Sequence, residues 1–297
     1  MKNQKIIIAA TALTVAFFVA VSMLSFYLTN DNYLSEPDNE ILMPDSGTAS
    51  APTPLPEQTP VIPNPEPDEP ETPDAPEDIP ETPVPKATYV RSKVNGLNIR
   101  SAPTTSASSL GYIDKGDMVA YKGTEGNWYI TEYKNKTAYI RAGTTYTELF
   151  ETELSSDPRI ESVIEEGYKL LGFPYVYGAV RLHNGNGVLL SNFDKTKFDC
   201  SSLMQYIFYY GAGVNLNQTT RTQVSQGVHV PKSEISRGDL IFFTNSSRYD
   251  NTGIERIGHV ALYLGENYIL HTASDYAVIE EISSQRWSYY IETRRMI

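Results

Sequence analysis

The chain has 297 residues, enough for two modest domains, and a formal net charge of −12. The acidity is uneven, because residues 31–86 carry 14 acids and one base whereas residues 87–297 carry 22 acids and 21 bases. The larger part is therefore nearly neutral and lacks the basic patch that binding to nucleic-acid phosphates requires.

The N-terminal segment is apolar. Ile6 to Leu28 carries no charge and is long enough to cross a bilayer as a helix, which takes roughly 20 residues. Lys2 and Lys5 precede it and acids follow, an order that places the N-terminus in the cytoplasm and the rest outside. We expect residues 1–30 to be an uncleaved single-pass membrane anchor. The alternative is a cleaved signal segment, for which Ala20-Val21-Ser22 is a weak site inside the apolar run. Both place the rest of the chain outside the cytoplasm, at the cell envelope.

Residues 31–86 hold 15 of the 19 prolines, many alternating with acids. Proline removes the amide donor and like charges repel, so we expect a disordered, extended linker. At about 3.1 Å per residue it reaches at most roughly 170 Å. We interpret it as a passive spacer.

In residues 87–150, short β-rich runs are separated by glycines. The β-rich runs are Tyr89-Val90, Leu97–Arg100, Met118–Tyr121, Trp128–Ile130 and Ala138–Ile140. Several short strands with turn signals between them predict a small all-β barrel or sandwich.

Helical signals begin at Asp157, which offers an N-cap before Pro158. Apolar residues then recur at helical spacing until Gly172, which we expect to end the run. A second helix is predicted to start at Cys200, capped by Asp199 and stopped by Gly211. After Pro231 the pattern is mainly β. Helices followed by an antiparallel sheet predict an α+β domain over residues 156–297.

Cys200 is the only cysteine, so it can form no internal disulfide. A cysteine in the first turn of a helix faces unpaired amides and the positive end of the helix dipole, which favour the nucleophilic thiolate. The same amides can hydrogen-bond an oxyanion. The alternative is a buried structural cysteine, and the position alone leaves the two readings about even.

Two histidines, His259 and His271, flank the turn Gly265-Glu266-Asn267. If Leu264 pairs with Glu266, the imidazoles lie directly opposite each other on one face of a hairpin; a two-residue turn would break that register. In contact, one can act as a base and the other can orient it. The alternative is a pair of polar strand residues at the surface.

The β-rich segment resembles a bacterial SH3-like domain. The resemblance rests on Leu97–Pro103, Lys115–Asp117, Asn127–Tyr129 and Ala138–Ile140, with Ala138-Tyr139 where such domains usually have Gly-Trp. It implies binding to cell-wall peptide or glycan. In the alternative, the barrel only packs against its neighbour.

Five motifs in the C-terminal part resemble, in family order, the NlpC-type cell-wall cysteine peptidases. They are Gly172–Gly178, Phe198–Ser202, Arg237–Phe243, Gly258–Gly265 and Ile269–Ser274. The resemblance implies a papain-like core that hydrolyses peptidoglycan stem peptides, typically between D-glutamate and the diamino acid. It implies Cys200 as nucleophile, His259 as base and His271 as the polar residue that orients the base.

The same resemblance extends to substrate contacts. Tyr175 matches a tyrosine beside the oxyanion site, and Asp199 and Ser201 match residues that hold a free substrate amine in some members. Two features depart from the pattern: Gly178-Ala179 replaces the usual Gly-Gly, with an added loop over residues 181–197, and Ser202 stands where glycine is commoner. The loop bears on substrate specificity.

No cofactor is expected, because His183, His229, His259 and His271 form no tight ligand motif with a carboxylate or thiol. Arg221 is a candidate contact for a stem carboxylate. The alternative, that it is a solvated arginine at the start of a helix, is at least as well supported. The sequence thus predicts an anchored, exported peptidoglycan endopeptidase. A non-catalytic wall-binding scaffold and an acyl transferase using the same triad are the alternatives.

Overall fold

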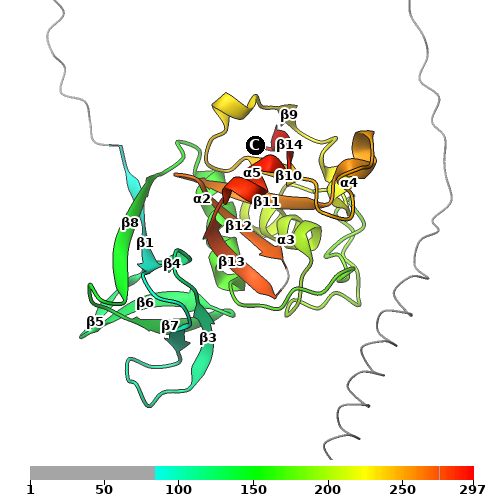
Figure 1. The fold of residues 1–297 in the computed structure, drawn as a ribbon. Helices are drawn as coiled ribbons and strands as arrows, with labels where there is room; N and C mark the ends of the chain where they lie inside the picture. Colours follow the sequence, from blue (N-terminus) through cyan, green and yellow to red (C-terminus); the bar gives the residue numbers. More distant parts are fainter. Residues whose placement is uncertain (1–83, 274) are drawn as a thin grey trace, which may run out of the picture. The chain divides into compact units, whose positions relative to one another are not determined.

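The computed structural model describes residues 84–273 and 275–297 (Figure 1). The predicted anchor and almost all of the predicted linker lie outside these residues. Within the described ranges, no helix combines the length and apolar character needed to span a bilayer. The first strand already begins at Lys86, the last residue of the predicted linker.

The N-terminal part is all β, as predicted. Its strands are β1 (Lys86–Ser92), β2 (Leu97–Arg100), β3 (Ser109–Ile113), β4 (Met118–Ala120), β5 (Gly123–Glu125), β6 (Trp128–Tyr133), β7 (Lys136–Arg141) and β8 (Thr147–Glu153). A five-stranded sheet has the order β3-β2-β7-β6-β5. β6 and β7 are joined by Lys134 and Asn135, whose φ angles of 52° and 56° suit a tight hairpin turn.

The C-terminal part places helices before a sheet. The helices are α2 (Pro158–Leu170), α3 (Cys200–Ala212), α4 (Thr220–Gln223) and α5 (Ser284–Ser288), with 3₁₀ turns at Lys232–Glu234 and Gly253–Arg256. The strands are β9 (Val228–His229), β10 (Leu240–Phe243), β11 (His259–Gly265), β12 (Tyr268–Ala273), β13 (Tyr276–Glu281) and β14 (Tyr290–Arg295).

The predicted caps of α2 and α3 are present, but one predicted stop is wrong. Asp157 and Asp199 accept hydrogen bonds from first-turn amides. Gly211 lies inside α3 rather than ending it, and Gly213, in the left-handed conformation with φ of 67°, is the cap. A Cβ at Gly211 would lie 2.4 Å from Val163 Cα, so glycine here allows α2 and α3 to pack closely.

One sheet runs through both parts. Its order is β8-β1-β4-β13-β12-β11-β10-β14-β9, with antiparallel neighbours. A single bridge between Met118 of β4 and Ile279 of β13 joins the two halves. Figure 1 shows α2 and α3 beside the C-terminal strands. α2 and α3 pack on one face of these strands, and Trp287 covers a smaller apolar cluster that includes Ile241 and Ile269.

A buried arginine ties the two parts together. Arg237 is 7% exposed, and its guanidinium pairs with Glu161 of α2 at 2.7 Å. It also donates to Tyr89 Oη of β1 at 2.9 Å and to Thr152 Oγ1 of β8 at 3.1 Å. Because β8 ends at Glu153 and α2 starts at Pro158, the connection is shorter than the predicted joint over residues 150–160.

The predicted register of the histidine hairpin is wrong, but its main consequence holds. Glu266 and Asn267 form a two-residue turn with φ of 50° and 66°, and Gly265 pairs with Tyr268. That turn alone would put His259 and His271 on opposite faces. A bulge between Tyr263 and Gly265 shifts the register by one residue, so that Leu262 pairs with Leu270 and the histidines become diagonal neighbours on one face.

Candidate active site

Cys200 is the first residue of α3 and is 8% exposed. The helix start is fixed by a capping box, in which Asp199 Oδ1 accepts from the Ser202 amide at 2.8 Å and Ser202 Oγ accepts from the Asp199 amide at 2.9 Å. Ser202, the departure from the expected glycine, therefore completes the cap. Backbone N–H groups of Ser201 and Val260 donate to the Cys200 sulfur, which places the thiol beside the strand that carries His259.

Behind the thiol lies a buried chain of polar groups. His259 Nε2 is 2.9 Å from His271 Nδ1, and the two rings meet edge to face with centroids 5.0 Å apart. His271 Nε2 lies 3.0 Å from Glu280 Oε1, and Arg286 Nη2 contacts the same oxygen at 2.8 Å. We call His259, His271 and Glu280 the histidine relay.

The relay has a consistent tautomer assignment. Glu280 is a hydrogen-bond acceptor when ionised, so His271 carries its proton on Nε2 and presents Nδ1 as an acceptor. His259 then carries its proton on Nε2 and donates to His271. Its Nδ1 is left with a lone pair, as a general base beside Cys200 requires. The 3.0 Å contact with the carboxylate favours these tautomers, although its angles are not those of a hydrogen bond and His271 Nε2 has no other partner among the described residues.

The pKa values of the relay support this assignment. Burial alone would raise the pKa of Glu280, but the contact with His271 and the nearby charges of His271 and Arg286 lower it to about 2. Burial lowers the pKa of His259 well below its ordinary value, and repulsion from His271 and Arg286 adds to the effect. Burial also lowers the pKa of His271, and the contact with Glu280 opposes this effect.

Burial opposes the effect of the helix start on the Cys200 thiol. Burial raises the pKa of Cys200 to about 12, and the charge of Asp199 adds to the rise. The Val260 and Ser201 amides do favour the thiolate, as the helix-start argument anticipates, but desolvation is the larger effect. Burial thus disfavours the charged forms of both Cys200 and His259.

Two cavities share Tyr175 and Gly258, and only one of them is lined by Cys200. The relay-side cavity is lined by His259 and Arg286, among others, and the cap-side cavity by Cys200 and Asp199. Burial raises the pKa of Tyr175 to about 12, so its hydroxyl remains protonated and able to donate. No residue of the N-terminal β part is among the described residues that line either cavity.

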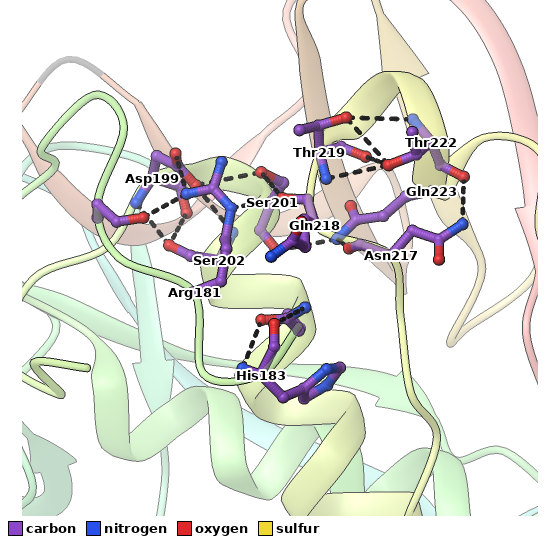
Figure 2. Close-up of polar contacts among 12 residues, drawn as sticks. Arg181, His183, Asp199, Ser201, Ser202, Asn217, Gln218, Thr219, Thr222 and Gln223 are labelled. Carbon is purple, nitrogen blue, oxygen red and sulfur yellow. Dashed lines mark hydrogen bonds and ion pairs between the residues drawn. The ribbon is translucent and has the colours of Figure 1, made fainter. Parts of the chain in front are cut away.

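Asp199 and Ser201 lie in the cap-side cavity, but Asp199 has other partners there. Oδ1 accepts from the Ser202 amide and from Ser201 Oγ, the latter at 3.2 Å, and Oδ2 accepts from Arg181 Nη1 at 2.7 Å (Figure 2). Both oxygens are therefore engaged without a substrate. This arrangement does not fit the expectation that Asp199 holds a free amine.

Arg221 lines the same cavity, together with Arg248. Both guanidiniums contact Glu255 Oε2, Arg221 at 2.5 Å and Arg248 at 3.1 Å. Arg221 is thus a partly exposed, paired residue at the cavity wall, a place compatible with the predicted carboxylate contact. Within the described ranges, no group of three or more histidine, cysteine and acidic side chains is arranged to hold a metal ion.

Sequence reasoning missed Glu280 and Arg181. The signal for Glu280 was faint: it lies in the alternating strand Tyr276–Glu281 that follows His271, at a position facing the same side of the sheet. Arg181 was placed in the added loop, with no sign in the sequence that it returns to the helix cap at Asp199.

Comparison with known proteins agrees with the five motifs. A model of the NlpC/P60 family matches residues 172–296, and a model of the bacterial SH3 domain matches residues 95–145. Residues 172–296 are therefore similar to the NlpC/P60 family, and residues 95–145, which precede them, are similar to the bacterial SH3 domain.

Individual relatives match only part of this chain, at about 30% sequence identity. The chain is 30% identical to gamma-DL-glutamyl hydrolase of Bacillus subtilis (strain 168) over 179 residues, which is 59% of this chain and 38% of that protein. It is 34% identical to peptidoglycan DL-endopeptidase CwlO of Bacillus licheniformis over 137 residues, 45% of this chain and 27% of the relative. The structure of the peptidoglycan hydrolase RipB from Mycobacterium tuberculosis is 29% identical with a TM-score of 0.37, covering 47% of this chain and 65% of that one. The chain thus spans less than two thirds of each.

Proposed function

We propose that the protein is an exported peptidoglycan hydrolase, a cysteine endopeptidase that cuts stem peptides between D-γ-glutamate and the diamino acid. The observations that carry the proposal are the placement of Cys200 at a capped helix start, next to the Val260 backbone of the strand that begins with His259, and the relay of His259, His271 and Glu280. The names of the hydrolase and endopeptidase relatives support the substrate class.

Acylation begins when the Cys200 sulfur attacks the scissile carbonyl carbon and its proton passes to His259 Nδ1. The carbonyl π electrons become an oxyanion. Candidate donors to it are first-turn amides of α3 and the hydroxyl of Tyr175, which lines the same cavity as Cys200. The C–N bond then breaks, His259 gives the proton to the departing amine, and a thioester remains on Cys200.

Deacylation repeats the proton transfers with water. His259 Nδ1 takes a proton from a water molecule that attacks the thioester carbonyl, and the C–S bond breaks. The proton returns to the sulfur, and the new carboxylic acid leaves. His271 and Glu280 touch no reacting atom in this scheme, so they are positioning residues that hold His259 in the tautomer with a free Nδ1.

Mass spectrometry of purified muropeptides incubated with the whole protein tests the proposal. We expect new products whose masses correspond to hydrolysis of the D-γ-glutamyl bond, and none with Cys200→Ala. Binding without any new product would favour the non-catalytic scaffold. Products extended by an added amine, with no hydrolysed product, would favour acyl transfer.

We further propose that the SH3 domain binds the cell wall and that the segment around Ile6–Leu28 anchors the protein to the membrane. A cavity in the SH3 domain supports the first part, because it combines Trp128 and Tyr146 with Arg100 and Arg141. Wall binding cannot be tested by deleting the SH3 domain. Arg237 donates to residues of β1 and β8, and the two parts share a sheet, so the deletion would expose the buried charge of Arg237.

Single substitutions test wall binding without truncation. Tyr146 is 43% exposed at the SH3 cavity, and Leu149, 48% exposed on β8, lies outside the residues lining it. We expect Tyr146→Ala to reduce co-sedimentation of the whole protein with sacculi and Leu149→Ala to leave it unchanged. Equal binding by both variants would remove this cavity from the proposal.

A further inference from the structure

The loop that precedes the nucleophile is firmly attached to α3. His183 is fully buried, and its backbone N–H and C=O both bond to the Gln205 side chain of α3 at 3.2 Å. His183 Nδ1 accepts from the Gly185 amide at 3.0 Å, and Leu182 is 3% exposed. Arg181 is adjacent to these anchored residues, so its backbone is held in place at the edge of the cap-side cavity.

The Arg181 side chain then turns into the helix cap. Its guanidinium donates to Asp199 Oδ2 at 2.7 Å and to the backbone carbonyl oxygens of Ala179 and Gln218 (Figure 2). The side chains of Arg181 and Asp199 are only 17% and 7% exposed. With Ser201 and Ser202 bound to the other oxygen, the carboxylate has a complete set of partners.

The charge of the cavity follows from these pairs. Its described charged lining residues are one carboxylate, Asp199, and three arginines, Arg181, Arg221 and Arg248. A substrate ammonium would need to displace Arg181 from Asp199, leaving a nearly buried guanidinium without its counter-charge. An acylated nitrogen carries no charge and brings a carbonyl oxygen, an acceptor for guanidinium donors.

We propose that Arg181 occupies the cation position on Asp199 and makes this cavity selective for stem peptides whose N-terminal amine is acylated, as it is in polymeric peptidoglycan, over peptides with a free amine. The inference rests on the proposed function, since it assigns the substrate class of that site. Arg181 is thus a specificity-determining residue contributed by the added loop.

Calorimetric titration of the whole protein carrying Cys200→Ala tests the proposal without turnover. The probes are L-alanyl-γ-D-glutamyl-L-lysine and its N-acetyl derivative. We expect the acetylated peptide to bind about tenfold more tightly or better, the scale of one charge contact. In Cys200→Ala combined with Arg181→Gln, which frees the charge of Asp199, the ratio of affinities should fall by a similar factor.

Arg159→Gln in the same background is the matched control, because Arg159 also pairs with an N-cap aspartate, Asp157, but outside the cavity lining. It should leave the ratio unchanged, and thermal unfolding should confirm that each variant is folded. If Arg181→Gln does not fold, Arg181→Lys, which keeps the charge, should retain the preference for the acetylated peptide.

Equal binding of the two peptides, tighter binding of the free amine, or an unchanged ratio in Arg181→Gln would overturn the inference. So would a failure of both peptides to bind when muropeptides are still cleaved at the D-γ-glutamyl bond. The absence of both binding and muropeptide cleavage would instead overturn the proposed function, and this inference with it.

Discussion

The relay side and the cap side of the site each contain a carboxylate–arginine pair, but the two pairs contact different kinds of group. On the relay side, Glu280 pairs with Arg286 and contacts His271, a group that can gain or lose a proton. On the cap side, Asp199 pairs with Arg181 and contacts the serines and amides of the helix start, none of which titrates near neutral pH. A carboxylate–arginine pair can therefore control either proton transfer or recognition.

Glu280 and Asp199 differ in the groups that each carboxylate contacts besides its arginine. Glu280 favours one tautomer of each imidazole, so its loss changes the base. Asp199 has all its partners in place before substrate arrives, so its charge is compensated and the cavity keeps a net excess of arginine. We expect substitutions on the relay side to change rates and substitutions on the cap side to change substrate preference and stability.

The largest effect should follow removal of the reacting groups. Cys200→Ala and His259→Ala should each lower kcat on a stem peptide by roughly 10⁴-fold or more. When residues act together in catalysis, removing one costs about as much as removing all of them. Because Cys200 is the only thiol in the sequence, a single alkylation by iodoacetamide should also abolish activity. Hydrolysis by Cys200→Ala at an appreciable rate would contradict the mechanism.

Smaller losses should follow changes in the positioning residues. We expect His271→Ala and Glu280→Ala to lower kcat by roughly 10- to 100-fold, with Glu280→Gln less severe because it keeps an acceptor oxygen. The exposed neighbour Glu281 provides the control Glu281→Gln, which should leave kcat unchanged. Identical kinetics of Glu280→Ala and Glu281→Gln would remove Glu280 from the relay.

The two N-caps provide a comparison of stability. Asp157→Ala should lower the free energy of unfolding by about 1 kcal/mol, the usual cost of a lost cap, since its partner Arg159 is 60% exposed. Asp199→Ala should cost more, roughly 2–4 kcal/mol, because it also leaves the nearly buried Arg181 without its counter-charge. Urea unfolding measures both, and equal losses would mean that the Arg181–Asp199 pair adds nothing to the cap.

The smallest effect concerns pH. His259 accepts a proton only when neutral, so activity should fall as the pH drops through its pKa, which burial, His271 and Arg286 hold well below 6.5. Arg286→Gln removes one of the positive charges that lower this pKa, so the acidic limb of the kcat profile should move to higher pH. Arg159→Gln is the control, and a limb that moves to lower pH would reverse the sign of the electrostatic argument.

Sequence patterns predicted the features that are set locally. The cap at Asp199 and the helix start at Cys200 follow from short-range spacing, and the structure contains both. The common face of His259 and His271 was also expected, but it depends on a bulge. The predicted hairpin register was wrong. The two-residue turn alone would move His271 to the other face of the sheet, and the bulge moves it back, so the two changes cancel.

The missed residues depend on contacts that spacing does not encode. Glu280 reaches His271 because β13 pairs with β12, and Arg181 reaches Asp199 because the added loop is fixed to α3 through His183 and Gln205. The helix start favours the thiolate, but the burial that raises the pKa of Cys200 comes from packing, which spacing does not encode either.

The division between the two sides is tested most directly by one set of kinetic measurements: kcat/KM of the wild type, Glu280→Gln and Arg181→Gln on the acetylated and free-amine tripeptides. We predict that Glu280→Gln lowers both values by the same factor and leaves their ratio unchanged. Arg181→Gln should lower the ratio of acetylated to free peptide by about tenfold or more. A changed ratio in Glu280→Gln together with an unchanged ratio in Arg181→Gln would contradict the account.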